Sequence, residues 1–188
     1  MEIRKPDQVT REMRNRAKTA NFGIIYGISS FGLSQRLNIS RQDSKELIDN
    51  YFLNFPGVRT YMDNCIKNAR DKGFVQTMMG RKRYLPDIHS RNAVVRGAAE
   101  RNAINAPIQG SAADMIKIAM VNIDKKMIAQ KLASKMILQV HDELVFDCLN
   151  SELDALKKIV KEEMENALPL DVPVYVEMGS GENWLDAH

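Results

Sequence analysis

The sequence has little of what marks a membrane protein, a secreted protein or a small zinc domain. Nowhere among its 188 residues does an apolar run approach the roughly 18 residues that a membrane-spanning helix needs. The N-terminus, MEIRKPDQVT, lacks the apolar segment of a secretory signal. The two cysteines, Cys65 and Cys148, lack the clustered spacing of a zinc site, so we interpret them as reduced structural thiols. We therefore expect a cytoplasmic protein without a membrane segment.

Proline and glycine are also scarce, with 6 and 10 residues, and 44% of the chain is hydrophobic, which argues against a disordered protein. The sequence contains no internal repeat, no low-complexity tract and no obvious linker. We expect a continuous folded structure that is long enough for a real core. Its polar beginning, EIRKPDQ, carries no helix start signal of its own, so we interpret the chain as a piece of a longer protein.

Charge is distributed unevenly, although the net formal charge is only +3. Residues 1–102 hold 19 Lys and Arg against 10 Asp and Glu, whereas residues 103–188 hold 8 against 14. A basic part of this kind suits a surface that faces a polyanion such as nucleic acid. Charged helices also show milder asymmetry without any partner, so the charge alone leaves both interpretations open.

The spacing of apolar residues is mostly helical and predicts a series of helices. The first three are expected from Thr10 to about Tyr26, from Ser29 or Ser30 to Leu37, and from Ser40 to a stop before Pro56. The others are expected over about 57–72, 91–105, 109–130 and 151–168, with a break at Pro107 between the fifth and the sixth.

Three segments have strand character instead. FVQTMMGRKRYLP alternates and turns around Gly80, which predicts a hairpin, and KMILQV, HD and ELVFDC predict a second one. VPVYVEM is expected to be a last strand. A helical majority with a small antiparallel sheet belongs to the α+β class.

In the first predicted helix, a stripe of four residues combines charge and aromatic surface. Arg14, Lys18, Phe22 and Tyr26 recur at intervals of four and therefore lie nearly above one another. The two cations suit phosphates, and the two rings suit a base or a sugar, so together they describe a nucleotide site. The same spacing is compatible with aromatic residues that face the core and cations that are merely solvated.

Two glycines lie on or next to this stripe. Gly23 and Gly27 cost helix stability and mark either a close approach or a point of flexing, so we hypothesise that the helix moves as a lid. Gly27 alone is also compatible with an ordinary helix C-cap.

The segment RNAINAPIQGSAAD presents three further polar side chains, Arg101, Asn105 and Gln109, again four residues apart. These side chains can donate hydrogen bonds to phosphates, sugars or base edges. Alternatively, Asn105 caps the next helix and Gln109 is an ordinary surface residue.

The segment QVHDELVF places three polar residues between two apolar runs. If His141 and Asp142 form a two-residue hairpin loop, they lack the glycine that such turns prefer, and a locally poor turn sequence points to function. A carboxylate at a rigid tip suits Mg²⁺, which binds oxygen ligands. Glu143 does not simply supply a second ligand, because adjacent strand residues point to opposite faces. A charged exposed turn explains the same residues.

Taken together, three segments resemble the signature motifs of family A DNA polymerases. RNRAKTANFGIIYG resembles the finger-helix motif, and RNAINAPIQGSAAD and QVHDELVF resemble the two later motifs of the palm, in the same order and with the same spacing. FPGVRTYM, GRKRYLPDI and GENWLDAH look like the connecting elements of that family, so the resemblance spans nearly the whole chain.

The resemblance implies a role for each candidate residue. Arg14 and Lys18 would hold the incoming triphosphate, with Lys18 also protonating the pyrophosphate leaving group. Phe22 and Tyr26 would bracket the incoming base and sugar, and a Phe at position 22 resembles family members that discriminate against nucleotides without a 3′-hydroxyl. The DNA-contacting residues would be Arg101, Asn105, Gln109 and His141. Asp142 would ligate catalytic Mg²⁺, with Glu143 in a supporting role.

The implied reaction is attack of a primer 3′-hydroxyl on the α-phosphate of a dNTP, with two Mg²⁺ ions in the complete enzyme. Finger helices would occupy about residues 1–73. The fingers-to-palm hairpin, further helices and the distal palm would occupy about residues 74–188. Such a protein acts on primer–template DNA in replication and repair, and a bacterial member would be nucleoid-associated.

One family motif is missing from the sequence. The other metal-binding aspartate belongs to a strand motif of the form DYSQIE, and nothing like it occurs in residues 1–13. The thumb and exonuclease domains, which also come earlier in the family, are missing as well. We therefore expect little or no activity from these 188 residues alone.

Two other functions are compatible with the residues. A non-catalytic nucleic-acid-binding module would use the basic part of the chain without a metal. A metal-dependent nuclease or phosphohydrolase would use Asp142 and degrade strands without added nucleotides.

Overall fold

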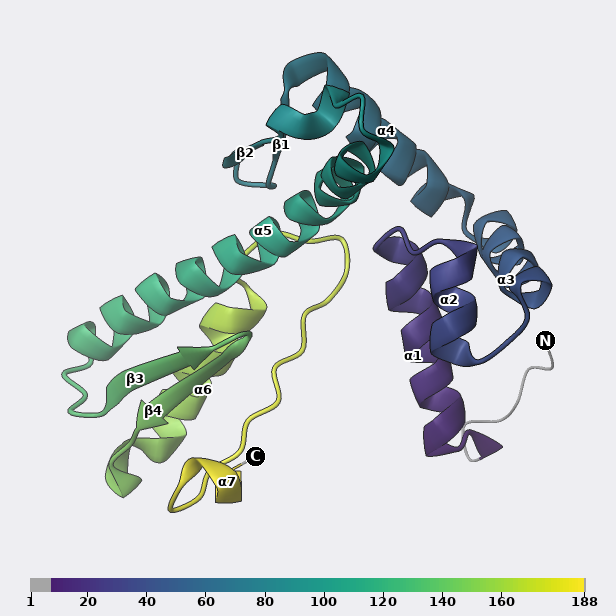
Figure 1. Cartoon of the computed structure of the whole chain (residues 1–188). Helices are drawn as coiled ribbons and strands as arrows, with labels where there is room; N and C mark the ends of the chain where they lie inside the picture. Colours follow the sequence, from purple (N-terminus) through teal and green to yellow (C-terminus); the bar gives the residue numbers. More distant parts are fainter. Residues whose placement is uncertain (1–7, 188) are drawn as a thin grey trace. The chain divides into compact units, whose positions relative to one another are not determined.

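The computed structural model describes residues 8–187 (Figure 1). The polar stretch up to Asp7, where the sequence offers no start signal and no aspartate motif, lies outside the described residues. The chain divides into two compact units, which we describe separately. The first comprises Met1–Gln76 and Gly80–Ile108, and the second comprises Thr77–Met79 and Gln109–His188.

The first unit begins with four helices. They are α1 (Arg11–Ile25), α2 (Ser30–Leu37), α3 (Arg41–Asn54) and α4 (Pro56–Lys72). Three begin at the hydroxyl caps that the sequence predicts, because Thr10, Ser29 and Ser40 each accept a hydrogen bond from the backbone N–H three residues later, at 3.2, 3.1 and 3.0 Å. These helix boundaries are therefore confirmed.

The turn between α1 and α2 is closed by a pair of backbone hydrogen bonds around Gly27. Gly27 has φ +73°, its N–H donates to the Ile24 carbonyl, and the N–H of Ile28 donates to the Gly23 carbonyl, both at 2.9 Å. The side chain of Ile28 lies against two glycines, since a Cβ on Gly23 or Gly32 would come within 3.2 or 3.0 Å of it. This close packing sets the angle at which α2 leaves α1.

Replacing Gly27 with alanine should destabilise the first unit by about 1–2 kcal/mol, the cost of a left-handed conformation for an L-residue. The added Cβ would also lie 3.3 Å from Cγ of Arg101. Urea unfolding followed by circular dichroism measures the loss. Gly57→Ala is the matched control, because that glycine lies in α4 with nothing within 4 Å of the added atom. Equal stability of the Gly27 variant and the wild type would contradict the prediction.

The predicted first hairpin is present in the same unit. Strands β1 (Phe74–Gln76) and β2 (Lys82–Tyr84) pair antiparallel, and Gly80 has φ +78° in the turn. The 3₁₀ helix η2 (Pro86–His89) follows. The core of the unit is formed by the buried residues Ala69, Val75, Leu85, Ile88, Ala99, Ala103 and Ala106. Apolar residues from α4, the hairpin and α5 (Ala93–Ala129) thus pack against one another.

The expectation of two helices separated at Pro107 was wrong, because α5 runs unbroken over Ala93–Ala129 with Pro107 inside it. Proline removes one backbone donor from a helix. Three residues before Pro107, the Ile104 carbonyl accepts a hydrogen bond from the Tyr61 hydroxyl at 3.3 Å. The buried Ala103 and Ala106 on the preceding turn keep the helix packed against its core. Tertiary packing therefore outweighs the helix-breaking tendency of proline here.

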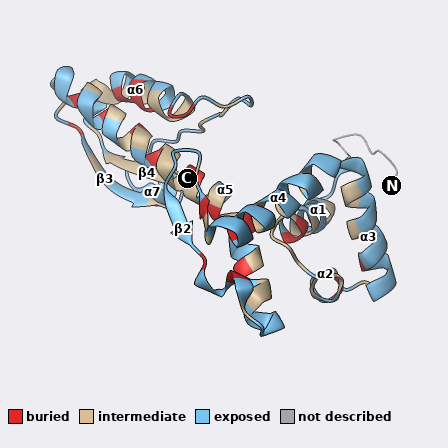
Figure 2. Ribbon diagram, turned by 90° about the horizontal axis from the view of Figure 1, so that it is seen from above, coloured by how far each residue is buried: buried red, intermediate tan, exposed pale blue. Residues whose placement is uncertain are grey.

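The second unit packs α6 (Leu153–Glu165) and a hairpin onto the C-terminal half of α5. The hairpin consists of β3 (Lys135–Val140) and β4 (Glu143–Asp147), as predicted, with a register shift between Met136 and Leu138. The buried core contains Ala119, Ile123, Met127, Leu156, Ile159, Val160 and Ala167. Figure 2 shows buried segments, in red, on α5 and α6, while β3 is mostly exposed. The two short antiparallel sheets and the helical majority confirm the α+β class.

A short 3₁₀ helix, η3 (Asn150–Glu152), holds the chain that enters β3. The Glu152 carboxylate accepts hydrogen bonds from the backbone N–H groups of Ala133 and Ser134, both at 2.9 Å, and from the Ser134 hydroxyl at 2.6 Å. These bonds, with the Ala133 N–H contributing most, lower the pKa of Glu152.

Because the folded pKa of Glu152 is lowered, its stabilising effect is fully present above the ordinary glutamate pKa of about 4.3 and is lost as pH falls through the folded pKa. Glu152→Gln should therefore be destabilised most at neutral pH, and its difference from the wild type should shrink in acid. Urea titrations of the variant and the wild type at neutral pH and at acid pH measure this difference. Asp154→Asn, an exposed carboxylate two residues away, is the control. A difference that stays constant with pH would contradict the linkage.

The prediction of a last strand at VPVYVEM was wrong. Residues 172–178 contain no strand, and the N–H of Val176 donates to the Glu165 carboxylate at 3.3 Å. The segment alternates like a strand, but β3 and β4 pair only with each other in the described part of the chain. A segment with alternating apolar residues forms a β-strand only when a neighbouring strand pairs with it through backbone hydrogen bonds. The short helix α7 (Trp184–Ala187) then follows. No helix among the described residues is long and apolar enough to cross a membrane.

Candidate nucleotide pocket and carboxylate hairpin

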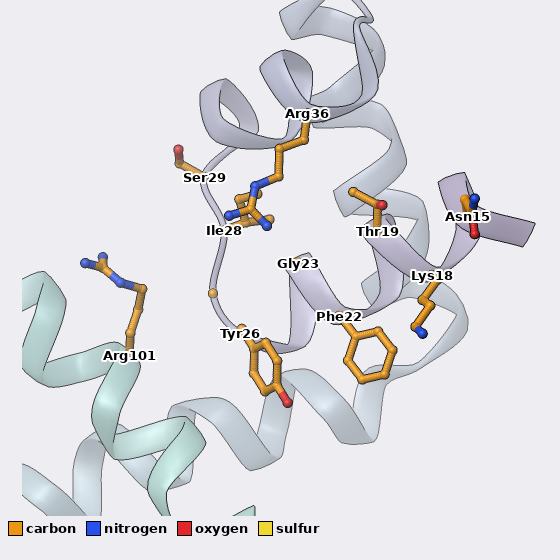
Figure 3. Close-up of a pocket in the computed structure, with 11 residues that line it drawn as sticks. Asn15, Lys18, Thr19, Phe22, Gly23, Tyr26, Ile28, Ser29, Arg36 and Arg101 are labelled. Atoms are coloured by element: carbon orange, nitrogen blue, oxygen red, sulfur yellow. The ribbon is translucent and has the colours of Figure 1, made fainter. Parts of the chain in front are cut away.

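A pocket of about 750 Å³ opens on the first unit along one face of α1 (Figure 3). Its lining residues are Asn15, Lys18, Thr19, Phe22, Gly23, Tyr26, Gly27, Ile28, Ser29, Arg36 and Arg101. The lining contains three cations and no carboxylate. A pocket with this charge favours an anion such as a phosphate chain.

Three of the four stripe residues lie together in this pocket. The rings of Phe22 and Tyr26 are 6.1 Å apart and inclined by 35°, and the Lys18 ammonium lies 6.0 Å from the Phe22 ring. Phe22 is 49% exposed, so this ring does not face the core. Figure 3 shows both rings and the ammonium on the same side of α1. The pocket therefore joins an aromatic surface to a positive charge, as a nucleotide requires.

Arg36 is a charged pocket residue that sequence reasoning missed. It lies in the last turn of α2, and Figure 3 shows its guanidinium pointing into the pocket. No spacing rule connects Arg36 with α1, because the connection depends on the turn at Gly27. Arg101 reaches the same pocket from α5, and its aliphatic stem lies 3.3 Å from where a Gly27 Cβ would be.

Other predicted contacts lie outside this lining. Arg14 is exposed on α1, one turn before Lys18. Asn105 is half-buried on α5, and its Oδ1 atom is buried without a hydrogen-bond partner among the described residues. Buried polar atoms normally have partners, so this oxygen is a candidate acceptor for a ligand. Gln109 is exposed and belongs to the second unit.

The tip of the β3–β4 hairpin carries the remaining candidates. His141 and Asp142 form the predicted two-residue loop, and both are exposed. His141 has φ +53°, a left-handed conformation that L-residues adopt at a cost. The Gln139 amide donates to its carbonyl at 3.0 Å and helps to hold it. Backbone strain of this kind gathers at functional sites, and the missing glycine was its signal in the sequence.

Two carboxylates lie at this hairpin tip. Asp142 is exposed and Glu143, the first residue of β4, is half-buried. Carboxylate oxygens suit a hard cation, and phosphoryl-transfer sites clamp their metals with more than one carboxylate. In residues 8–187 no group of three or more His, Cys, Asp or Glu side chains could hold a metal ion. Asp142 therefore fits the role of one ligand, not of a complete site.

Comparison with known proteins identifies the family. A model of DNA polymerase family A matches residues 1–186. The chain belongs to DNA polymerase family A. The family motifs on which the resemblance rests thus lie inside one continuous match that covers both units.

Bacterial DNA polymerase I proteins are similar to this family A chain along nearly its whole length. DNA polymerase I of Streptococcus pneumoniae (serotype 4) is 53% identical over 185 residues, which cover 98% of this chain. DNA polymerase I of Bacillus subtilis is 50% identical over 181 residues, or 96% of this chain. The chain spans about a fifth of the length of these relatives, 21% in both cases.

A solved structure is also similar. The polymerase domain of Pol1 from M. smegmatis, in complex with a DNA primer–template and dNTP, matches with a TM-score of 0.93 and 48% identity. The match covers 96% of this chain and 32% of that chain. Polymerases of this family are generally metal-dependent.

Proposed function

We propose that this chain provides the nucleotide-binding helix and one metal-binding carboxylate of a template-directed DNA polymerase. The observation that carries the proposal is the pocket on α1, where Lys18, Phe22 and Tyr26 lie together without any carboxylate. Family membership and the DNA- and dNTP-bound M. smegmatis domain support it.

Along α1, the cations and the aromatic rings bind different parts of the nucleotide. Lys18 and Arg14 bind the triphosphate, and the Lys18 ammonium gives a proton to the departing pyrophosphate. Phe22 and Tyr26 bracket the base and sugar. Arg36 adds a further cation on the α2 side, where a guanidinium can form two parallel hydrogen bonds with a phosphate.

The remaining polar residues hold the DNA. Arg101, Asn105 and Gln109 contact primer and template near the growing end, and His141 lies beside the primer terminus. The buried Oδ1 of Asn105 accepts a hydrogen bond from the nucleic acid, which completes its bonding. The first unit corresponds to the fingers and the second to the distal palm.

Asp142 would hold Mg²⁺, with Glu143 supporting it, and the second ligand would come from outside the described residues. When bound, Mg²⁺ activates the primer 3′-hydroxyl and neutralises charge on the phosphates. The reaction is nucleotidyl transfer. The primer 3′-oxygen forms a bond to the α-phosphorus, and the bond between that phosphorus and pyrophosphate breaks. Such an enzyme acts in replication and repair, in the bacterial cytoplasm at the nucleoid.

Primer extension on the 188-residue chain separates this function from its rivals. With Mg²⁺, dNTPs and a labelled primer–template, the chain alone should extend the primer little or not at all, because Asp142 is one ligand without its partner. Robust extension would contradict the incomplete metal site. Shortening of the labelled primer in the absence of dNTPs would favour a nuclease instead.

A chimera tests the complementary prediction. This chain replaces the matching 185-residue segment of the pneumococcal DNA polymerase I, which supplies the rest of the polymerase. The chimera should bind a primer–template and extend it. A non-catalytic binding module would bind the DNA but leave the chimera unable to incorporate nucleotides.

A further inference from the structure

The β1–β2 hairpin displays an exposed ring and a cation on one face, apart from the residues assigned above. The register pairs Phe74 with Tyr84 and Gln76 with Lys82, which places these four side chains on the same face. We call them the hairpin face. Val75 points to the other side and is 6% exposed in the core of the first unit.

Tyr84 is held in place although it is largely exposed. Its ring meets Phe74 edge-on at 5.7 Å, with the planes at 61°, and Tyr84 is 68% exposed. The next residue, Leu85, is buried in the core, and its N–H donates to the Gly73 carbonyl at 2.9 Å. The ring therefore offers an accessible surface whose orientation is fixed in advance, so that little entropy is lost when a ligand stacks on it.

The charged residues of the hairpin itself have one sign. From Gly73 to Pro86 the sequence contains three cations, Arg81, Lys82 and Arg83, and no Asp or Glu. The Lys82 ammonium lies 4.6 Å from the Phe74 ring, on the same face as Tyr84. Lys82 and Tyr84 are two strand residues apart, a separation on the order of 7 Å. A cation and a ring at this spacing match a phosphate and its neighbouring base.

We infer that the hairpin face binds an unpaired segment of a nucleic-acid strand, with one base stacked on Tyr84 and a phosphate at Lys82. Along a strand, an exposed ring stacks on a base that is not paired, because the base faces inside a duplex are covered by the neighbouring pairs. The absence of carboxylates across the hairpin favours the polyanion over a mixed-charge protein surface. In the proposed polymerase, this strand would be unpaired template, but the binding itself requires neither metal nor dNTP.

Fluorescence anisotropy of the full chain with a short labelled oligothymidylate, without metal or dNTP, tests the inference. Tyr84→Ala should weaken binding by about 5- to 150-fold, the range measured for losing one stacked base. Tyr84→Phe keeps the ring and should bind within about twofold of the wild type, since stacking does not need the hydroxyl. Lys82→Gln should reduce the salt slope for a single strand by about 0.7.

Matched controls separate this surface from general effects. Tyr175→Ala removes another tyrosine, 82% exposed in the C-terminal segment, and Lys158→Gln removes an exposed cation on α6. Neither should change binding. A blunt duplex should bind the Tyr84→Ala variant as well as the wild type.

Tyr84→Trp in a Trp184→Phe background gives a direct signal, because the chain has a single tryptophan. Its fluorescence should be quenched when oligothymidylate is added. Wild-type affinity of Tyr84→Ala, an equal loss in Tyr84→Phe, an equal loss for the blunt duplex, or an unquenched tryptophan would each overturn the inference. None of these results depends on nucleotide incorporation, so they leave the proposed polymerase function to its own test.

Discussion

In the chimera, replacing Asp142 with alanine should reduce nucleotide incorporation by about 10³-fold or more, because metal stabilisation of transition-state charge is worth several kcal/mol and each 1.36 kcal/mol is tenfold in rate. Affinity for the primer–template should stay within a few-fold of the wild type, since Asp142 carries negative charge and does not attract DNA. Single-turnover incorporation gives the rate, and anisotropy gives the affinity.

Asp147→Ala is the matched control for this experiment. Asp147 is an exposed carboxylate at the other end of β4, so its removal changes the same charge in the same hairpin. Its incorporation rate should be close to that of the unmodified chimera. If both variants lose activity equally, the hairpin acts only through its stability or charge. If neither loses activity, Asp142 is no metal ligand.

Replacing Lys18 with alanine should lower kcat/KM for the dNTP by about 10²–10⁴-fold, the range for general-acid groups. The substitution removes a phosphate-binding charge and the proposed proton donor together. Steady-state kinetics in the chimera measure kcat and KM separately. Loss of binding alone would raise KM, whereas loss of the proton donor would lower kcat.

Lys18→Arg distinguishes these two roles. Arginine keeps the positive charge beside Phe22, but a guanidinium does not release its proton in proteins. The variant should therefore recover KM more than kcat. Full recovery of kcat would show that charge alone is needed, and no recovery of either constant would show that the shape of the ammonium site matters most.

Most helix boundaries could be predicted because hydroxyl caps are local chemistry. Thr10, Ser29 and Ser40 each satisfy a backbone donor three residues ahead, and that information lies within one turn of chain. The positive φ of Gly27 and Gly80 was predictable for the same reason. Such features need no knowledge of what packs nearby.

Two errors arose where distant contacts decide the structure. At Pro107 the sequence predicts a break, yet the buried Ala103 and Ala106 keep α5 continuous. In residues 172–178 the strand pattern is real, but a strand forms only against a neighbour, and β3 and β4 pair only with each other in the described residues. Local propensity contains no information about the residues that pack beside Pro107 or about the presence of a neighbouring strand.

The candidate site divides in the same way. The stripe of Lys18, Phe22 and Tyr26 was readable because helix periodicity alone puts residues four apart on one face. Arg36 was not readable, because it reaches the pocket through the α1–α2 turn, whose angle depends on Ile28 packing against two glycines. The His141–Asp142 turn, which lacks glycine, indicated an unusual backbone conformation. The sequence did not say that His141 would be the residue to adopt the left-handed conformation.

Template-directed incorporation by the chimera tests the central claim most directly. With four primer–templates that differ only in the next template base, the chimera should add the complementary nucleotide in each case, with Mg²⁺ present, and its Asp142→Ala variant should add none above background. A chimera that folds and binds the primer–template but adds no nucleotide, or that adds nucleotides equally well without Asp142, would contradict the assignment of this chain to the catalytic part of a DNA polymerase.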